Sequence, residues 1–139
     1  MRTIKEVRKQ KRKEDALQMM FEREYKKYDI VLVDFGSNHV GSEQGGIRPA
    51  IIVQNDLGNH FSGSTIVLPI TSKIKKLDQP THTLLIKNKS NGLTEDSMVL
   101  GECMRQISKK RIIKYIGSVY SETDRENIKK VFFANWEVA

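Results

Sequence analysis

The sequence predicts a mainly β fold, in which a strongly bent antiparallel sheet or small barrel is followed by a C-terminal helix. Short β-branched runs recur from residue 29 onward, each bounded by Gly, Asn, Asp, Ser or Pro. The segment "SETDRENIKKVFFANW" near the C-terminal end has helical periodicity. A chain of 139 residues is long enough for one hydrophobic core but not for two.

Residues 1–27 are predicted to form a separate basic arm, either helical or disordered. The arm contains no Gly or Pro and is rich in helix formers, but its apolar residues form a stripe too thin to found a core. It holds 10 Lys and Arg against 5 Asp and Glu, whereas residues 28–139 hold 14 against 12. Most of the net charge of +7 therefore belongs to the arm, and charge alone is weak evidence that the domain of residues 28–139 binds nucleic acid.

Six strands are predicted between residues 29 and 117. They are "DIVLVDF", "AIIVQ", "STIVLPI", "THTLLIK", "DSMVLGECMRQI" and "RIIKYIG". The second is expected to end at a turn over Asn55–Gly58. The fifth is expected to run unbroken, with Glu102 on one face and Cys103 on the other. Short strands without intervening helices predict antiparallel pairing.

The C-terminal helix is predicted to begin at Ser121. Ser121 and Asp124 have the spacing of a capping box, which satisfies backbone N–H groups at a helix start. One face of the helix is expected to pack on the sheet through Ile128, Val131, Phe132 and Asn135.

Several kinds of site find no support. No glycine pattern joins a strand to a helix, so neither a dinucleotide site nor a P-loop is indicated. The single cysteine, Cys103, makes no internal disulfide and is most simply a small buried hydrophobe. His39, His60 and His82 lack metal-ligand spacing, and we interpret them as surface or turn residues rather than general bases. We therefore expect no metal or other cofactor.

The N-terminal segment "MRTIKEVRKQKRKED" is basic, but no apolar segment of a secretory signal follows it. No apolar run approaches the length that spans a membrane. A cytoplasmic location without membrane association is expected.

The stretch "GSEQGGIRPAIIVQND" contains the clearest candidate site. Its glycines allow the backbone to approach a ligand closely. Pro49 restricts Arg48 to an extended backbone, so a strand end aims the guanidinium. A guanidinium fixed in this way can bind a phosphate through two hydrogen bonds. A salt bridge from Arg48 to Glu43 that only closes the loop is an equal alternative.

A second strand end has the same character. The segment "LPITSK" places Thr71, Ser72 and Lys73, two hydroxyls and a cation, just outside the core. Glu102 is a carboxylate inside a predicted strand, which is unusual. It has either an edge position or an arginine as a structural partner.

These segments together resemble the MazF/PemK family, the toxin components of type II toxin–antitoxin systems. The resemblance rests on "VDFGSNHVGSEQGGIRPAIIVQNDLGN", "IVLPITSKIKK", "PTH" and "GLTEDSMVLGECMRQISKKRI", which occur in the expected order. It implies an SH3-like small β-barrel with a C-terminal helix, a homodimer, and sequence-specific cleavage of single-stranded RNA. A cognate antitoxin is the implied protein partner, and DNA is contacted only through the antitoxin.

The resemblance also implies residue roles. The catalytic arginine of the family falls on Arg48 and its catalytic threonine on Thr71, and the ribose 2′-hydroxyl attacks the adjacent phosphorus without a metal. Glu102 matches the position where some relatives have an aspartate proposed as the general base, and Glu43 competes for that role. The residues expected to contact RNA are Ser42, Glu43, Gln44, Ser72, Lys73, Cys103 and Arg105.

The chain departs from the family pattern at Tyr28–Asp29, where most relatives have Gly-Asp, and the basic arm has no counterpart in most of them. Two other functions on the same fold stay open: a non-catalytic toxin that inhibits DNA gyrase, and a general RNA-binding module. An RNA-binding module uses aromatic stacking platforms, for which the loops offer only Phe35, His60 and Phe61.

Overall fold

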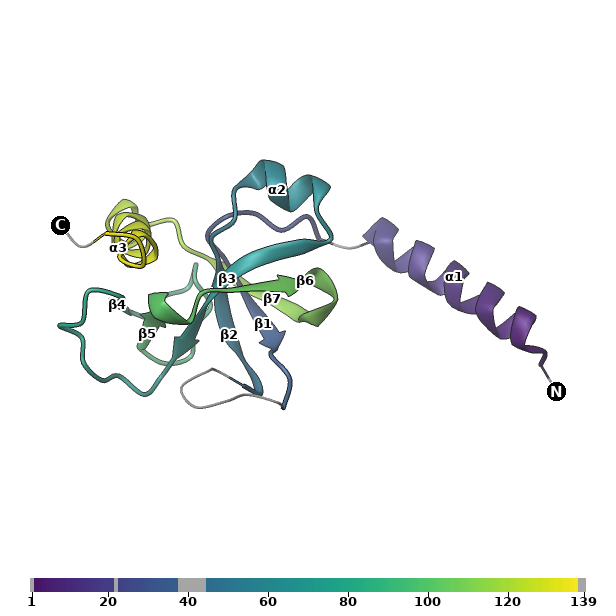
Figure 1. Cartoon of the computed structure of the whole chain (residues 1–139), viewed down its shortest axis with the longest axis horizontal. Helices are drawn as coiled ribbons and strands as arrows, with labels where there is room; N and C mark the ends of the chain where they lie inside the picture. The colour runs from purple at the N-terminus through teal and green to yellow at the C-terminus, as the bar shows by residue number, and fades with distance from the viewer. Residues whose placement is uncertain (1, 22, 38–44, 138–139) are drawn as a thin grey trace.

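The computed structural model of the chain describes residues 2–21, 23–37 and 45–137, with the side chains of residues 15–21 outside the description. A bent β-sheet forms the body, and one helix projects away from it (Figure 1). The strands are β1 (Asp29–Asp34), β2 (Ile47–Ile52), β3 (Ser64–Thr71), β4 (His82–Leu85), β5 (Ser97–Leu100), β6 (Arg105–Ser108) and β7 (Ile112–Ser118). The helices are α1 (Ile4–Phe21), α2 (Asp56–Phe61) and α3 (Glu122–Phe133), with 3-10 turns η1 (Gly101–Cys103) and η2 (Lys109–Arg111).

The sheet is antiparallel throughout, with the order β4-β5-β3-β2-β1-β7. Strand β3 pairs with β2 along one edge. Along its other edge, the N-terminal half pairs with β6 and the last two residues pair with β5. Strand β7 lies beside β1, where Asp29 pairs with Ser118. This strongly bent antiparallel sheet with a C-terminal helix confirms the predicted fold class.

Both faces of the central strands are buried. Along β1, Ile30 faces one apolar cluster, whereas Val31 and Val33 face the other. The first cluster also contains Ile128 and Val131 of α3, so the helix covers that face of the sheet. Strands buried on both faces need apolar residues at successive positions, which is why β1, β2 and β3 have continuous apolar runs.

The connection between β2 and β3 contains a helix, so the predicted simple turn over Asn55–Gly58 was wrong. The Asn55 side chain accepts a hydrogen bond from the Gly58 backbone N–H at 2.8 Å, and the helix continues to Phe61. Inside it, Asn59 is buried and accepts hydrogen bonds from Thr65 and from Gln54. Asn is common both in turns and at helix N-caps, so Asn55 fits either, and the exposed apolar residues of α2 give no inward-facing pattern.

The predicted unbroken strand through residues 96–107 was also wrong. The chain leaves the sheet at Gly101, makes the turn η1 and returns as β6 on the other half of β3. The reason is a close approach: a Cβ on Gly101 would lie 2.5 Å from the Val131 carbonyl oxygen and 2.8 Å from that of Thr81. Glu102 and Cys103 therefore lie on a turn, not on opposite faces of a strand.

Helix α3 begins as predicted. The Ser121 hydroxyl accepts a hydrogen bond from the Asp124 backbone N–H at 3.2 Å. Ile128 and Val131 are buried against the sheet. Beyond the last turn, the Asn135 side-chain amide donates to the Gly101 carbonyl at 2.9 Å, which ties the end of the chain to η1.

The N-terminal helix α1 projects from the body, and its residues from Ile4 to Glu14 are exposed (Figure 1). Arg23 contacts the sheet, because its guanidinium lies 3.5 Å from the centre of the Tyr115 ring. Tyr28 then enters β1 with φ of 76°, a left-handed conformation in which the glycine found in most relatives would be unstrained. Among the described residues, no helix combines the length and the apolar character needed to cross a membrane.

The close approach at Gly101 generates a stability prediction. We expect Gly101→Ala to lower the free energy of unfolding by about 1–3 kcal/mol, because the new methyl group must displace the backbone of α3 or of residue 81. Gly63→Ala is the matched control, since a Cβ there meets no atom within 4 Å. Its effect should stay within about 0.5 kcal/mol in urea unfolding. Equal stability of the two variants would contradict the packing of α3 on the turn.

Candidate functional site

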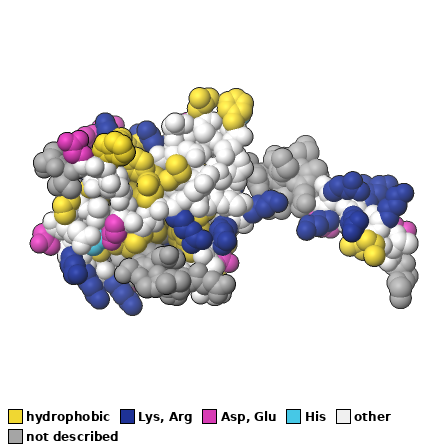
Figure 2. Space-filling view, viewed as in Figure 1, with side chains coloured by type: hydrophobic (Ala, Val, Ile, Leu, Met, Phe, Trp, Pro, Cys, Tyr) yellow, Lys and Arg dark blue, Asp and Glu magenta, His cyan; other side chains and the backbone are white. Residues whose placement is uncertain are grey.

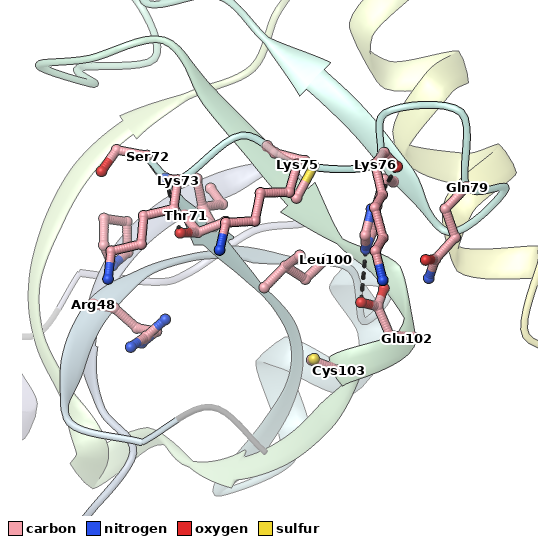
Figure 3. A pocket seen from close by; sticks show the side chains of 14 residues that line it. Arg48, Thr71, Ser72, Lys73, Lys75, Lys76, Gln79, Leu100, Glu102 and Cys103 are labelled. Carbon is pink, nitrogen blue, oxygen red and sulfur yellow. Dashed lines mark hydrogen bonds and ion pairs between the residues drawn. The ribbon is translucent and has the colours of Figure 1, made fainter. Parts of the chain in front are cut away.

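A cleft of about 880 Å³ opens beside the C-terminal end of β3 (Figure 3). The end of β3, the start of β2, the loop between β3 and β4, and the turn η1 surround it. Six of the residues singled out from the sequence line it, although they come from three separate segments: Arg48, Thr71, Ser72, Lys73, Glu102 and Cys103.

Strand pairing brings Arg48 and Thr71 together. In the β2–β3 ladder Ala50 pairs with Pro69. Arg48 and Thr71 lie two residues beyond this last pair, on the same side of the ladder. Because both belong to these neighbouring strands, the sheet restricts their relative position. A loop alone would not do so.

Local contacts orient the arginine. Arg48 lies within β2, next to Pro49, and its side chain is half-buried. Its Nε donates to the Gly45 carbonyl at 3.1 Å. Gly46, with φ of 73°, accepts from Phe35 N–H and donates to the Gly36 carbonyl. The sequence alternative, a salt bridge to Glu43, falls on a residue outside the described ranges.

The threonine hydroxyl is oriented from the opposite side. Thr71 Oγ1 accepts a hydrogen bond from the Lys73 backbone N–H at 3.1 Å. A hydroxyl oxygen that accepts one bond still has its proton to donate. Thr71 can therefore donate a hydrogen bond to an anionic oxygen in the cleft.

The cleft is strongly cationic. Among the residues that the structure describes, Arg48, Lys73, Lys75 and Lys76 line it together with one carboxylate, Glu102, which gives these side chains a net charge of +3 (four minus one) with His82 neutral. Lys and Arg side chains are visible on the side of the loop between β3 and β4 and along α1 (Figure 2). A cationic cleft attracts and concentrates a polyanion.

His82 lies in this cleft, so its interpretation as a surface or turn residue was wrong. Its side chain is only 7% exposed. Nε2 lies 2.7 Å from Glu102 Oε1, and Nδ1 lies 2.9 Å from the Lys76 carbonyl oxygen (Figure 3). Sequence reasoning missed it because the 20 residues that separate His82 from Glu102 hide the pairing. The segment "PTH", which contributed to the family resemblance, was the available signal.

Opposing effects act on the pKa of His82. Burial lowers the pKa, while the hydrogen bonds to Glu102 and to the Lys76 carbonyl raise it, and the net result is a pKa above the ordinary 6.5. The imidazolium form therefore persists to a higher pH than in an ordinary histidine.

The remaining predicted residues lie elsewhere. Arg105 is outside the cleft, where it donates from Nη1 to the Phe35 carbonyl at 3.1 Å and lies over the Phe35 ring. Phe35 is buried, so it offers no face to a base, and the exposed Phe61 belongs to α2 at the opposite end of β3. The predicted RNA contacts Ser42, Glu43 and Gln44 fall outside the described residues.

The side chains able to bind a metal ion are few among the described residues of this cleft. Across residues 2–21, 23–37 and 45–137, no group of three or more His, Cys, Asp or Glu side chains is arranged to hold a metal ion. The carboxylate of Glu102 is paired with an imidazole, and its other charged neighbours along the cleft are cations.

The bent antiparallel sheet and the cationic cleft at its edge define a small β protein suited to a polyanionic ligand. The chain belongs to the PemK-like, MazF-like toxin family of type II toxin–antitoxin systems, since the profile of that family matches residues 26–132. Its relatives include endoribonuclease EndoA of Bacillus subtilis strain 168, which is 42% identical over 106 residues, or 76% of this chain and 86% of EndoA.

Solved structures agree with the fold. MazF (Form-I) from Deinococcus radiodurans matches with a TM-score of 0.68 at 20% identity, over 82% of this chain and 97% of that one. An endoribonuclease in complex with its cognate antitoxin, from a mycobacterial species, matches with a TM-score of 0.66 at 15% identity, over 83% and 99% of the two chains. At these identities the matches establish the fold, and it is the one that the sequence predicts.

The raised pKa of His82 generates a prediction about stability and pH. Its interactions stabilise the folded state fully below the unfolded pKa, near 6.5, and this contribution is lost as pH rises through the higher folded pKa. Wild type should therefore exceed His82→Gln in unfolding free energy by more at about pH 5.5 than at about pH 8.5. Urea unfolding at the two values measures it. A difference that is independent of pH would contradict the pairing.

Proposed function

We propose that this toxin is an endoribonuclease that cleaves single-stranded RNA at specific sequences, by attack of the ribose 2′-hydroxyl and without a metal. The observation that supports this best is that Arg48 of β2 and Thr71 of β3, two neighbouring paired strands, line the same cationic cleft. The name of the Bacillus subtilis relative, endoribonuclease EndoA, supports the same activity.

The proposed chemistry assigns each group a task. Arg48 stabilises the negative charge that grows on the phosphate oxygens, and Thr71 donates its hydroxyl hydrogen bond to the same phosphate. Glu102 takes the proton of the 2′-hydroxyl as general base. The 2′ oxygen then bonds to phosphorus, and the bond to the 5′ oxygen breaks. That oxygen takes up a proton from solvent water, which leaves a 2′,3′-cyclic phosphate and a 5′-hydroxyl, and Glu102 returns its own proton to the solvent.

The RNA strand is proposed to lie along the cationic wall of the cleft. Ser72 and Lys73 contact its backbone, and Cys103, on the turn beside Glu102, lies where a base edge can be read. Arg105 is also part of the proposed RNA-binding set, but its guanidinium donates to the Phe35 carbonyl outside the cleft. The loop residues Ser42, Glu43 and Gln44 complete the proposed RNA-binding set.

Further proposals concern partners and location. The mycobacterial structure holds an endoribonuclease with its cognate antitoxin, which supports a cognate antitoxin as the protein partner of this chain. We propose a homodimer of the domain spanning residues 28–139, with residues 1–27 as a basic arm. DNA is reached only through the antitoxin. We also propose a cytoplasmic location, which an RNA substrate would require.

Arg48→Ala and Thr71→Ala test the assignment. Each should lower the rate of RNA cleavage on the order of a hundredfold or more, because each removes a preoriented donor to the developing charge. Cleavage is measured by mapping new RNA 5′ ends after incubation of an RNA pool with purified protein. Circular dichroism establishes that the variants are folded.

Lys89→Ala is the matched control, since it removes an exposed cation that lies outside the cleft. It should cleave at the wild-type rate. Wild-type cleavage by Arg48→Ala would refute the catalytic assignment. A wild-type protein that binds RNA without cutting it would instead support a non-catalytic toxin or binding module on this fold.

Chelation tests the metal-free mechanism. Because cationic side chains rather than a metal ion neutralise the phosphate, cleavage should continue in EDTA at an unchanged rate and leave 5′-hydroxyl ends. Ligation that requires prior 5′ phosphorylation identifies such ends. Activity that disappears with EDTA and returns with magnesium would rule out this mechanism.

A further inference from the structure

His82 and Glu102 form a polar pair in the cleft, and the proposed chemistry assigns no role to His82. The Glu102 side chain is 36% exposed and sits on η1, a turn of three residues. Its partner His82 is 7% exposed and sits on β4, where it pairs with Leu100 of β5. The buried His82 side chain therefore holds the more exposed Glu102 side chain. The sheet fixes His82, and His82 fixes Glu102.

The protons on His82 follow from its partners. The Lys76 carbonyl oxygen only accepts hydrogen bonds, and it accepts one from the Gln79 backbone N–H as well. Nδ1 of His82 must therefore be the donor to this carbonyl. Lys76 has φ of 51°, an uncommon left-handed conformation, at the residue whose carbonyl receives both bonds.

With Nδ1 protonated, the contact between His82 and Glu102 has two states. Either the imidazolium donates from Nε2 to a carboxylate, or a neutral Nε2 accepts from a protonated Glu102. In both states one proton lies between Nε2 and Oε1. The contact at 2.7 Å thus uses one oxygen of Glu102 and aims the carboxyl group, which leaves the second oxygen for another partner.

An unrestrained glutamate would not serve as a base in this cleft. It has several rotatable bonds, and the lysines that line the cleft, Lys73, Lys75 and Lys76, would draw it to different places. A general base must lie within hydrogen-bond reach of the proton it removes, and small displacements are costly in rate. His82 supplies the restraint from a buried position.

We propose that His82 is a positioning residue for RNA cleavage, which holds the Glu102 carboxyl group in place through Nε2 while the strand ends present Arg48 and Thr71. The inference rests on the proposed endoribonuclease function. It assigns His82 no contact with the RNA and no chemical step of its own. The competing explanation is that His82 only anchors the loop between β3 and β4 through Lys76.

Two substitutions separate these explanations. An asparagine amide can replace Nδ1 of the imidazole, so His82→Asn keeps the bond to Lys76 and loses the bond to Glu102. A glutamine amide can replace Nε2, so His82→Gln keeps a donor to Glu102 and loses the bond to Lys76. A positioning role predicts that Gln preserves activity better than Asn. Loop anchoring predicts the reverse order.

The experiment uses the full chain and a short single-stranded RNA that contains a cut site mapped with wild-type protein. We expect His82→Asn to lower kcat about 10-fold or more with KM unchanged, and His82→Gln to keep kcat within about threefold of wild type. In a Glu102→Gln background, His82→Asn should cause no further loss, because its effect acts through the carboxyl group. Thermal unfolding midpoints verify that every variant is folded.

The outcomes are distinct. If wild type cleaves RNA and His82→Asn cleaves equally well, or better than His82→Gln, the positioning role is overturned while the proposed function stands. Additive losses in the double variant overturn it too. If wild type cleaves no RNA under any condition, the proposed function fails and the positioning role fails with it.

Discussion

The contact between Gly101 and α3 sets where the chain turns between β5 and β6. The Gly101 N–H donates to the Thr81 carbonyl, the Gly101 carbonyl accepts from Asn135, and a Cβ on Gly101 would lie 2.5 Å from the Val131 carbonyl oxygen. No larger residue fits there, so β5 ends and the chain crosses to the other half of β3. The same turn carries Glu102 and Cys103 into the cleft. The packing of Gly101 against α3 thus also determines where Glu102 and Cys103 lie in the cleft.

The cations of the cleft favour phosphate binding, whereas the carboxylate of Glu102 opposes it. A site built only to hold phosphates gains from cations and loses from a carboxylate, which repels the ligand. Glu102 nevertheless lies among Arg48 and the lysines. Its pairing with His82, whose pKa is raised above the ordinary value, offsets part of that repulsion. A carboxylate retained at such a cost is better explained by a role in proton transfer than by affinity for the RNA.

Local patterns predicted the parts of the fold that local forces determine. The apolar runs gave β1 to β4 and β7, and the spacing of Ser121 and Asp124 gave the start of α3. The break at Gly101 was not predictable, because it results from a contact with residues thirty positions later in the chain. His82 was missed for the same reason. The chemistry of two strand ends singled out Arg48, Thr71, Ser72 and Lys73, and the family resemblance supplied their expected roles.

The dependence of η1 on the end of the chain has a consequence for synthesis. Asp29 of β1 meets Ser118 of β7, and Gly101 meets Asn135, so both ends of the domain are needed before the cleft is complete. Translation proceeds from the N-terminal end, and contacts between distant segments form last. A growing chain therefore has no finished cleft until the segment that contains Asn135 has been made. A chain that stops before Asn135 lacks the hydrogen bond that ties its end to the turn bearing Glu102 and Cys103.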